Sequence, residues 1–480
     1  MDKVGNIQLD GFTKYHKPEG KIVILGFGSV GQTVLPMVLR HFDIDPSRVL
    51  VIDKKYHSLF DKYRGLIKYL KIEITRENMD QVLSKVLEPG DFLVNVSLNI
   101  DGIEIVEWCL NHGIMYTDTS IERWPEEPDE TIKEYAERTL YSTHQEIRKR
   151  CGNSKGKATA VVTNGANPGL VTYFTKQALC NLRRRANLGG IKRDPQTKEE
   201  WAELAKALDV KVIQIAERDT QILKQPKEPN VFTNTWSCEG FWAEGRAPSE
   251  LGWGTHENPN GPEGGSLHKE GPGNAAFLHQ PGVSVLVKSW VPEGGCFNGF
   301  LIQHSEAVTL SDYLTTADKS YRPTVYYAYQ PTDAAMASVH EMRGSELRFH
   351  RKTRIMKNSI LTGRDELGVL LLGHKFTAYW FGSQLTIDEA RTLIPGESAT
   401  SLQVGASLLG GMVWAYRNPE MGYCEPEDLP HTEVLAVARQ YLGPVVGVRS
   451  DWTPLRHRNT LYKMDYDESD VWAFPNFRIQ

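Results

Sequence analysis

A glycine-rich turn between an apolar run and a helix-like segment constrains the fold of this chain more than any other feature. Residues 21–25 read KIVIL, an apolar β-branched run typical of a buried parallel strand. Gly26, Gly28 and Gly31 follow in the pattern G-x-G-x-x-G and lead into a helix-like segment. In this strand–turn–helix context the three glycines predict a dinucleotide-binding unit, because they permit a tight turn, close approach to a pyrophosphate, and close helix packing.

Strand-like and helix-like segments continue to alternate after this turn. A helix is expected at 103–112, and further strands are expected at 48–52, 66–74, 92–96 and 114–117. This alternation predicts an α/β fold, with a doubly wound parallel sheet of the Rossmann type in residues 1–165.

An acid at the end of the second strand indicates which dinucleotide binds. Asp53 lies 22 residues after Gly31, where a carboxylate can accept both hydroxyls of a ribose. A carboxylate repels a 2′-phosphate, so NAD is favoured over NADP, although Lys54 and Lys55 oppose that preference. Ser97 and Asn99 follow a later strand, where a plain turn explains them equally well. The expected cofactor contacts are Gly26, Gly28, Ser29, Val30, Gly31, Asp53, Ser97 and Asn99.

The character of the sequence changes after the turn at 164–169. Residues 166–395 are rich in Gly, Pro and Trp and predict a second, α+β domain for substrate binding and dimerisation. Its polar segment 252–273 is long enough to be a lid or a binding loop. A patterned apolar helix follows within the last segment, 396–480, but its periodicity does not reveal where it packs.

Composition excludes several classes of protein. Lys and Arg number 55 against 60 Asp and Glu, a net charge of −5 that offers no basic footprint for nucleic acid. We find no apolar stretch long enough for a membrane span and no signal peptide at the N-terminus. The six cysteines are dispersed, without a C-x-x-C pair, which favours reduced thiols and argues against a thiolate metal site. These patterns predict a cytoplasmic protein without a bound metal.

A segment that combines tryptophan with carboxylates is a candidate cation site. Trp236, Trp242, Glu239 and Glu244 alternate with small residues, and Glu217 lies upstream. Aromatic faces and carboxylates together can hold an alkylammonium ion. From the residues alone, however, a half-buried strand with solvated acids explains the segment better.

Three further polar groups follow expected strands. His304 ends a probable strand beside Glu306, and its charge is easily shifted near neutral pH. Asp101 and Glu122 follow expected strand ends, where ligand crevices form in open α/β sheets. An exposed acid at the start of a helix explains these two carboxylates as well.

Four stretches of this chain resemble a known family. They read KIVILGFGSVGQ, TNGANPGLV, NTWSCEGFWAEG and ESATSLQVGASLLGGMVWAYRNPEMGYCEPEDL. They are similar to the bacterial homospermidine synthases, within the wider saccharopine-dehydrogenase-like group. The resemblance extends over nearly all of residues 20–460. It implies that the C-terminal helices return to the first domain and that the protein is a homodimer.

The resemblance also implies a reaction. Two putrescines would give sym-homospermidine and ammonia, and spermidine would also serve as a substrate. NAD would stay tightly bound and be regenerated in each cycle, because the imine formed with the second amine is reduced by the same bound cofactor.

Site residues follow from the same resemblance. Trp236 would hold the substrate ammonium by a cation–π contact, and Glu217 would bind the reacting amine and assist proton transfer. Asn167, Glu244 and His304 would line the same pocket, with Asn167 also near the cofactor. Glu122 and Asp101 would lie closer to the pocket mouth.

Two other functions remain open. A saccharopine- or carboxynorspermidine-type dehydrogenase would consume NAD(P) with each turnover and would need Arg or Lys for a substrate carboxylate, for which Arg218 and Arg246 are candidates. A non-catalytic NAD-binding protein on the same fold would bind NAD without changing any diamine.

Overall fold

The parallel sheet expected in the N-terminal part is present, and it belongs to one of two units. A computed structural model describes residues 3–4, 7–125, 134–190, 194–458, 460, 463, 466 and 468–479. The first unit contains residues 1–129, 143–170 and 388–442, and the second contains residues 130–142, 171–387 and 443–480.

The described strands of the first sheet run parallel in the order β22-β8-β7-β6-β3-β4-β5. β4 and β5 lie on one side of β3, and β6, β7 and β8 lie on its other side. This is the strand order of a dinucleotide-binding fold. The strands are β3 (Ile22–Leu25), β4 (Val49–Asp53), β5 (Lys68–Lys71), β6 (Phe92–Asn95), β7 (Met115–Asp118), β8 (Ala160–Val161) and β22 (Tyr423–Cys424). A short separate pair is formed by β1 (Lys3–Val4) and β2 (Ile7–Gln8).

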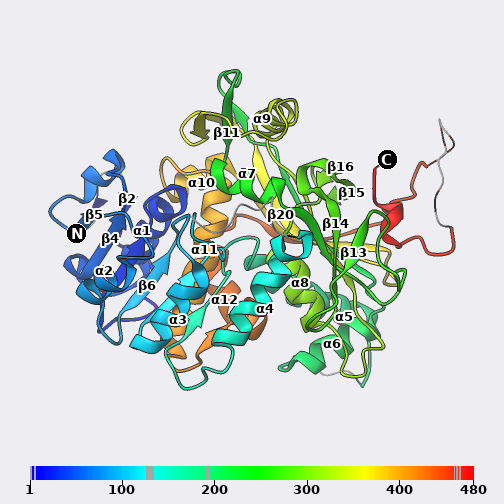
Figure 1. The fold of residues 1–480 in the computed structure, drawn as a ribbon, viewed down its shortest axis with the longest axis horizontal. Coiled ribbons are helices and arrows are strands. Elements are labelled where there is room, and N and C mark those ends of the chain that lie inside the picture. Colours follow the sequence, from blue (N-terminus) through cyan, green and yellow to red (C-terminus); the bar gives the residue numbers. More distant parts are fainter. Residues whose placement is uncertain are drawn as a thin grey trace. The chain divides into compact units, whose positions relative to one another are not determined.

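Helices cover this sheet, and the last of them come from far along the chain. In Figure 1 the orange α11 and α12 lie beside the blue and cyan elements of the same unit, and α11 packs on α1. The expected return of the C-terminal helices is therefore confirmed. The helices with most of their residues in this unit are α1 (Ser29–His41), α2 (Met79–Val86), α3 (Gly102–His112), α4 (Leu140–Cys151), α10 (Ile387–Leu393), α11 (Ala399–Arg417) and α12 (His431–Ala438).

A mixed sheet forms the centre of the second unit. β9 (Val212–Asp219) lies between β17 (Thr324–Gln330), which is parallel to it, and β20 (Arg364–Leu372), which is antiparallel. The other strands of the sheet are β12 (Pro248–Gly252), β13 (Gly265–Leu267), β14 (Ala275–Pro281), β15 (Leu286–Val291), β16 (Gly295–Phe300), β21 (Ala378–Thr386) and β23 (Val445–Ser450).

Short strand pairs and five helices complete the described part of this unit. β10 (Ile222–Leu223) pairs with β19 (Ile360–Thr362), and β11 (Val231–Asn234) pairs with β18 (Lys352–Ile355). The helices are α5 (Leu170–Ala186), α6 (Lys198–Ala207), α7 (Cys238–Arg246), α8 (Ser305–Tyr313) and α9 (Asp333–Arg343).

Several local expectations need correction. The strand expected at 66–74 is limited to β5, because the amides of Leu66 and Ile67 turn back to the carbonyl of Tyr63. Within the segment 396–480, residues 443–480 belong to the second unit, since β23 pairs with β21 there.

All six cysteines are free, and no helix of the described residues is long and apolar enough to cross a membrane.

The polar segment 252–273, expected as a lid or binding loop, is anchored to the second unit at several points. The buried Glu257 accepts hydrogen bonds from the Phe474 amide and the Thr324 hydroxyl. Tyr141 donates to the carbonyl of Glu270, and β13 pairs with β14. The segment is therefore an integral part of the fold.

Close packing of α11 against the turn at 164–169 offers a test of the first unit. A Cβ added at Gly411 would lie 2.0 Å from Asn164 Nδ2, and Asn164 is fixed by hydrogen bonds with the Ser407 carbonyl and hydroxyl. We expect Gly411→Ala to lower the free energy of unfolding by about 1–3 kcal/mol, the usual cost of overpacking. Urea unfolding measures this change.

Gly189→Ala is the matched control, because a Cβ there meets no atom within 4 Å. If Gly411→Ala unfolded at the same urea concentration as the wild type, the described packing of α11 would be wrong.

Candidate functional site

The glycine turn of the first unit has the geometry that a pyrophosphate requires. Gly26 has φ +97°, and a Cβ there would lie 2.7 Å from the Val96 carbonyl oxygen. A Cβ at Gly31 would lie 2.2 Å from the Gly26 oxygen, whereas a Cβ at Gly28 would meet nothing within 4 Å. Helix α1 begins at Ser29 without a side-chain cap, so its first N–H groups are available to an anion. These residues fit a dinucleotide phosphate.

The side chain of Ser29 is occupied within the protein. It is buried, and its hydroxyl lies 2.7 Å from the hydroxyl of Ser401 in the first turn of α11. Thr33, one turn further along α1, donates to Glu397. Ser29 is thus suited to contact a phosphate through its backbone N–H, as is the half-buried Val30 beside it.

Asp53 lies at the end of β4 with its carboxylate beside the glycine turn. It accepts hydrogen bonds from the amides of Phe27, at 2.7 Å, and Lys55, at 2.8 Å. Partial burial alone would raise the pKa of Asp53, but His57 and these two amides outweigh burial and hold the pKa below its usual value. The ionised carboxylate suits ribose hydroxyls, and Lys54 is paired with Glu73 at 3.5 Å.

The other expected cofactor residues of the first unit are in turns. Ser97 follows β6 and donates its hydroxyl to Asn95 at 2.6 Å, whereas Asn99 is exposed with φ +63°. Asn167 is half-buried in the turn between β8 and α5. This turn depends on Gly169, which has φ +120° and lies so close to Gly165 that a Cβ would be 2.4 Å from its oxygen.

The two candidate acids of the first unit have local partners. Asp101 caps α3 by accepting the amides of Ile103 and Glu104, and it forms an ion pair with Arg123 at 3.2 Å. Its burial raises its pKa. Glu122 is half-buried and accepts a hydrogen bond from the Ser120 hydroxyl at 3.0 Å. Asp101 thus lies at a helix start, but it is buried, whereas the alternative explanation expected an exposed acid.

The candidate residues of the second unit form one connected cluster that begins on β9. Glu217, only 2% exposed, accepts a hydrogen bond from the Tyr327 hydroxyl at 2.6 Å. Tyr327 and Tyr329 alternate along β17 with their rings stacked at 5.1 Å. The indole N–H of Trp236 donates to the Tyr329 hydroxyl at 3.0 Å. Burial and the charge of Glu217 raise the pKa of both tyrosines, so both hydroxyls stay protonated.

His304 lies between two carboxylates in the same cluster. Its Nε2 is 3.5 Å from Glu244 Oε2, and its Nδ1 is 3.5 Å from Glu306 Oε2. The ring also contacts Tyr327 edge-on at 4.3 Å. Burial lowers the pKa of His304, but Glu306 and Glu244 outweigh it and raise the pKa to about 10. The two carboxylates therefore favour the charged form of the imidazole in the free protein.

The segment around Trp236 is a helix, not the half-buried strand that its residues alone suggested. Ser237 caps α7 by accepting the Gly240 amide, which begins the helix directly after Trp236. The guanidinium of Arg246, four residues later in the chain, lies over the Trp242 ring, 4.0 Å from the ring centroid. Trp236 joins the acidic cluster, and Phe241 of the same segment stacks on it at 5.6 Å and contacts the Tyr329 ring edge-on.

Four predicted residues are thus brought together, and three residues of the cluster were missed. Glu217, Trp236, Glu244 and His304 belong to the cluster of the second unit, whereas Asp101, Glu122 and Asn167 belong to the first unit. Glu306, Tyr327 and Tyr329 complete the cluster. The alternation of tyrosines in 324–330, TVYYAYQ, was the signal that could have indicated Tyr327 and Tyr329.

Within the described residues, no three His, Cys, Asp or Glu side chains are grouped as metal ligands are.

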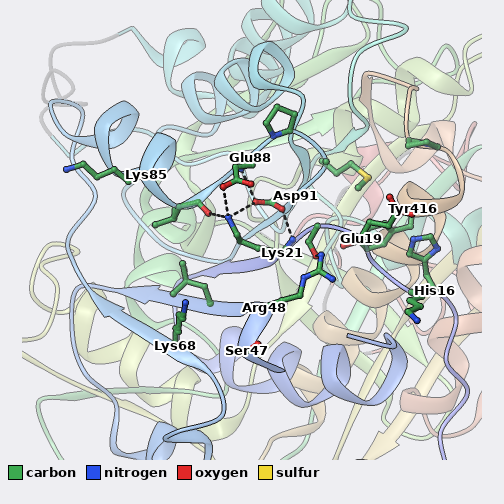
Figure 2. A pocket seen from close by; sticks show the side chains of 18 of the residues that line it. His16, Glu19, Lys21, Ser47, Arg48, Lys68, Lys85, Glu88, Asp91 and Tyr416 are labelled. Atoms are coloured by element: carbon green, nitrogen blue, oxygen red, sulfur yellow. Dashed lines mark hydrogen bonds and ion pairs between the residues drawn. The ribbon is translucent and has the colours of Figure 1, made fainter. Parts of the chain in front are cut away.

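A cavity of about 880 Å³ lies at the amino ends of the strands of the first sheet (Figure 2). The glycine turn lies at their carboxyl ends. Lys21 there is paired with Glu88 at 3.3 Å and Asp91 at 3.7 Å, and Arg48 donates to the carbonyls of Pro18 and Gly20. Dinucleotides bind at carboxyl ends of parallel strands, so this cavity is not the cofactor site.

Comparisons with known proteins agree with these features. Residues 22–161 match the family described as "Saccharopine dehydrogenase NADP binding domain", and residues 165–448 match "Saccharopine dehydrogenase C-terminal domain". The chain is 43% identical to the homospermidine synthase of Blastochloris viridis, over 97% of this chain and 98% of that protein. It is 41% identical to the homospermidine synthase of Mesorhizobium japonicum over the full length of both.

A solved structure is similar over the same extent. The homospermidine synthase of Legionella pneumophila in complex with NAD superimposes with a TM-score of 0.89, at 40% identity, over 97% of this chain and 98% of that one.

The position of Asp53 predicts how the cofactor is selected. We expect Asp53→Asn to weaken NAD binding about 10–100-fold, since hydrogen bonds to a charged group contribute about 1.5–3 kcal/mol. The same change removes the repulsion of a 2′-phosphate, so the ratio of NADP to NAD affinity should rise. Isothermal titration calorimetry with each dinucleotide measures both effects.

Lys54→Gln is the control, because Lys54 is an exposed side chain paired with Glu73. NAD affinity should stay unchanged in that variant. Wild-type NAD affinity in Asp53→Asn would contradict the assigned ribose contact.

Proposed function

This chain belongs to the saccharopine dehydrogenase family and, within it, to the homospermidine synthases, and on that premise we propose that it joins two putrescines into sym-homospermidine and ammonia. NAD, when bound, takes a hydride from the first amine and returns it to the imine made with the second. In this proposal the cofactor stays tightly bound and is regenerated in each cycle, so no NADH accumulates.

The acidic cluster of the second unit is the observation that carries the substrate class. Glu244 and Glu306 pair with His304, and Glu217 joins this group through the hydroxyl of Tyr327. Both oxygens of Glu306 and one of Glu244 are buried without a hydrogen-bond donor. Buried carboxylate oxygens require donors, and the N–H groups of a dicationic amine supply them.

The same surroundings argue against a substrate that bears a carboxylate. Arg246 lies over the Trp242 ring, and Arg218 donates to the Gly294 carbonyl. Both arginines considered for a saccharopine- or carboxynorspermidine-type dehydrogenase thus have partners within the protein. An anionic substrate group would meet the carboxylate cluster instead, which repels it.

The proposed roles follow from the ionisation of the substrate. An alkylamine with a pKa near 10.4 is protonated at pH 7 and must lose a proton from the reacting end before a hydride can leave. Glu217 binds that end and assists the proton transfer. The face of Trp236, with Glu244, holds an ammonium by cation–π and ionic attraction, which contributes about 0.5–2 kcal/mol for the ring.

Residues of the first unit have different roles in the proposal. Ser97, Asn99 and Asn167 contact the cofactor, and Glu122 attracts diamines by its charge. Asp101, which caps α3 and pairs with Arg123, lies with Glu122 closer to the mouth of the substrate site in this proposal and adds its negative charge there.

The proposal extends to spermidine as a second substrate, since spermidine carries the same aminobutyl end as putrescine. It also includes a homodimer and a cytoplasmic location, in line with the resemblance and with the dispersed free cysteines.

The stoichiometry of the reaction tests the proposed function. Purified protein is incubated with putrescine and a small amount of NAD while polyamines are separated by chromatography and NADH is followed by absorbance. We expect homospermidine in many-fold excess over NAD, without NADH accumulation. NADH that rises in step with product would identify a dehydrogenase, and tight NAD binding without any product would identify a non-catalytic NAD-binding protein.

Replacement of Trp236 tests the cation site directly. Trp236→Ala should lower synthase activity by up to about 30-fold, since the upper value for the cation–π contact, about 2 kcal/mol, corresponds to that factor. NAD affinity, measured by calorimetry, should remain that of the wild type, because the residue lies outside the dinucleotide-binding unit.

Trp242→Ala is the matched truncation and should retain most of the activity, since Arg246 already covers that ring. Normal turnover by Trp236→Ala would show that the ring does not hold the substrate.

A further inference from the structure

We propose that binding of the diamine expels a proton from His304. In this proposal a substrate ammonium takes over the carboxylates of Glu244 and Glu306, and the imidazolium gives up its proton to the solvent. The inference rests on the proposed function, because it describes what a diammonium substrate does to that same site.

The free protein places an internal cation where the substrate cation is needed. His304 is 5% exposed, and its two ring nitrogens each lie 3.5 Å from a carboxylate, one on α7 and one on α8. Among the described residues no Lys or Arg forms an ion pair with Glu244 or Glu306. The imidazolium is therefore the charge that balances these two acids.

The carboxylates keep unused acceptor capacity toward a better donor. A distance of 3.5 Å is longer than a good hydrogen bond, and Glu306, 1% exposed, has no donor on either oxygen. Glu244 Oε2 also lacks a donor. An ammonium ion carries three N–H groups, whereas each ring nitrogen offers a single donor at 3.5 Å, so the ammonium is the better donor to these carboxylates.

The groups around the His304 ring determine how a substrate ammonium changes the pKa of His304. Glu244 faces the ring from α7 and Glu306 from the first turn of α8, and β17 contributes the edge of Tyr327. The Tyr327 hydroxyl is itself bonded to Glu217 on β9. An ammonium among these groups is a like charge beside the imidazolium, which lowers the pKa of His304 from about 10.

The helix that follows His304 acts in the same direction. α8 begins at Ser305, so the ring belongs to the residue at the N-terminal end of a nine-residue helix. The partial positive charge of a helix N-terminus opposes a cation there. Once the substrate neutralises the two carboxylates, the helix favours the neutral imidazole.

The proton balance is simple. One ring N–H bond of the imidazolium breaks, its proton passes to water or buffer, and a neutral imidazole with one free lone pair remains. That lone pair makes His304 a base beside the bound amine only after the substrate has arrived. The substrate thus creates a proton acceptor that Tyr327 connects to Glu217, the group that binds the reacting end in the proposed function.

Calorimetry with a dead-end complex tests this linkage. Full-length protein saturated with NADH cannot take a hydride from putrescine, so the diamine binds without turnover. Titration at pH 7.5 in phosphate, HEPES and Tris buffers, which differ in ionisation enthalpy, counts the protons released. We expect about one proton per putrescine, since putrescine itself stays fully dicationic at this pH.

The affinity for putrescine should depend on pH in a defined direction. Because a proton leaves on binding, a lower proton concentration favours the complex. Affinity should therefore rise about tenfold per pH unit between pH 7 and pH 9. His304→Gln keeps a polar group that cannot titrate, and should bind putrescine with no proton release and a flat pH profile.

His350→Gln is the matched control. His350 also pairs with a carboxylate, Glu341, at 3.0 Å, but lies outside the acidic cluster, so proton release should match the wild type. If the wild type bound putrescine without releasing a proton, the linkage would be overturned and the amine site would stand. The same holds if His304→Gln released as many protons as the wild type. Absence of putrescine binding to the wild type would overturn the proposed substrate and the linkage with it.

Discussion

The parallel pairing of β9 with β17 is the constraint on which the acidic cluster depends. Its register sets Glu217 opposite Tyr329, and Tyr327 two residues earlier lies on the same face. The tyrosine hydroxyls then reach Glu217 and Trp236, and the Tyr327 ring supports His304. A shift of one residue would turn both tyrosines to the other face and remove the Tyr327 hydroxyl from the buried Glu217. The site therefore depends on backbone pairing in the centre of a sheet.

Sequence reasoning predicted the first unit well because its signals are local. The glycine turn, the strand before it and Asp53 lie within about 30 residues, and each has a fixed place in a parallel sheet. The side chain of Ser29 was less predictable, since its partner Ser401 is 372 residues away in the chain. The contact of Asp101 with Arg123 likewise depends on a turn that no periodicity describes.

The acidic cluster could not be assembled from local patterns alone. Its members lie on or next to β9, α7, α8 and β17, and the residues alone linked Glu217 with Trp236 only as an acid upstream of the tryptophan segment. Tyr327 and Tyr329 looked like ordinary strand residues, because aromatic side chains are common in sheets. The charge of His304 depends on two neighbours, of which the sequence shows Glu306 but not Glu244 on the opposite side of the ring.

The dispersal of the acids over several elements has an evolutionary consequence. Glu217, Glu244 and Glu306 are contributed by a strand and two different helices, so no single substitution or loop exchange reverses the charge of the pocket. A mutation that introduced one arginine would still leave two carboxylates to repel an anionic group. The negative charge of the cluster therefore persists through any single mutation of its three acids.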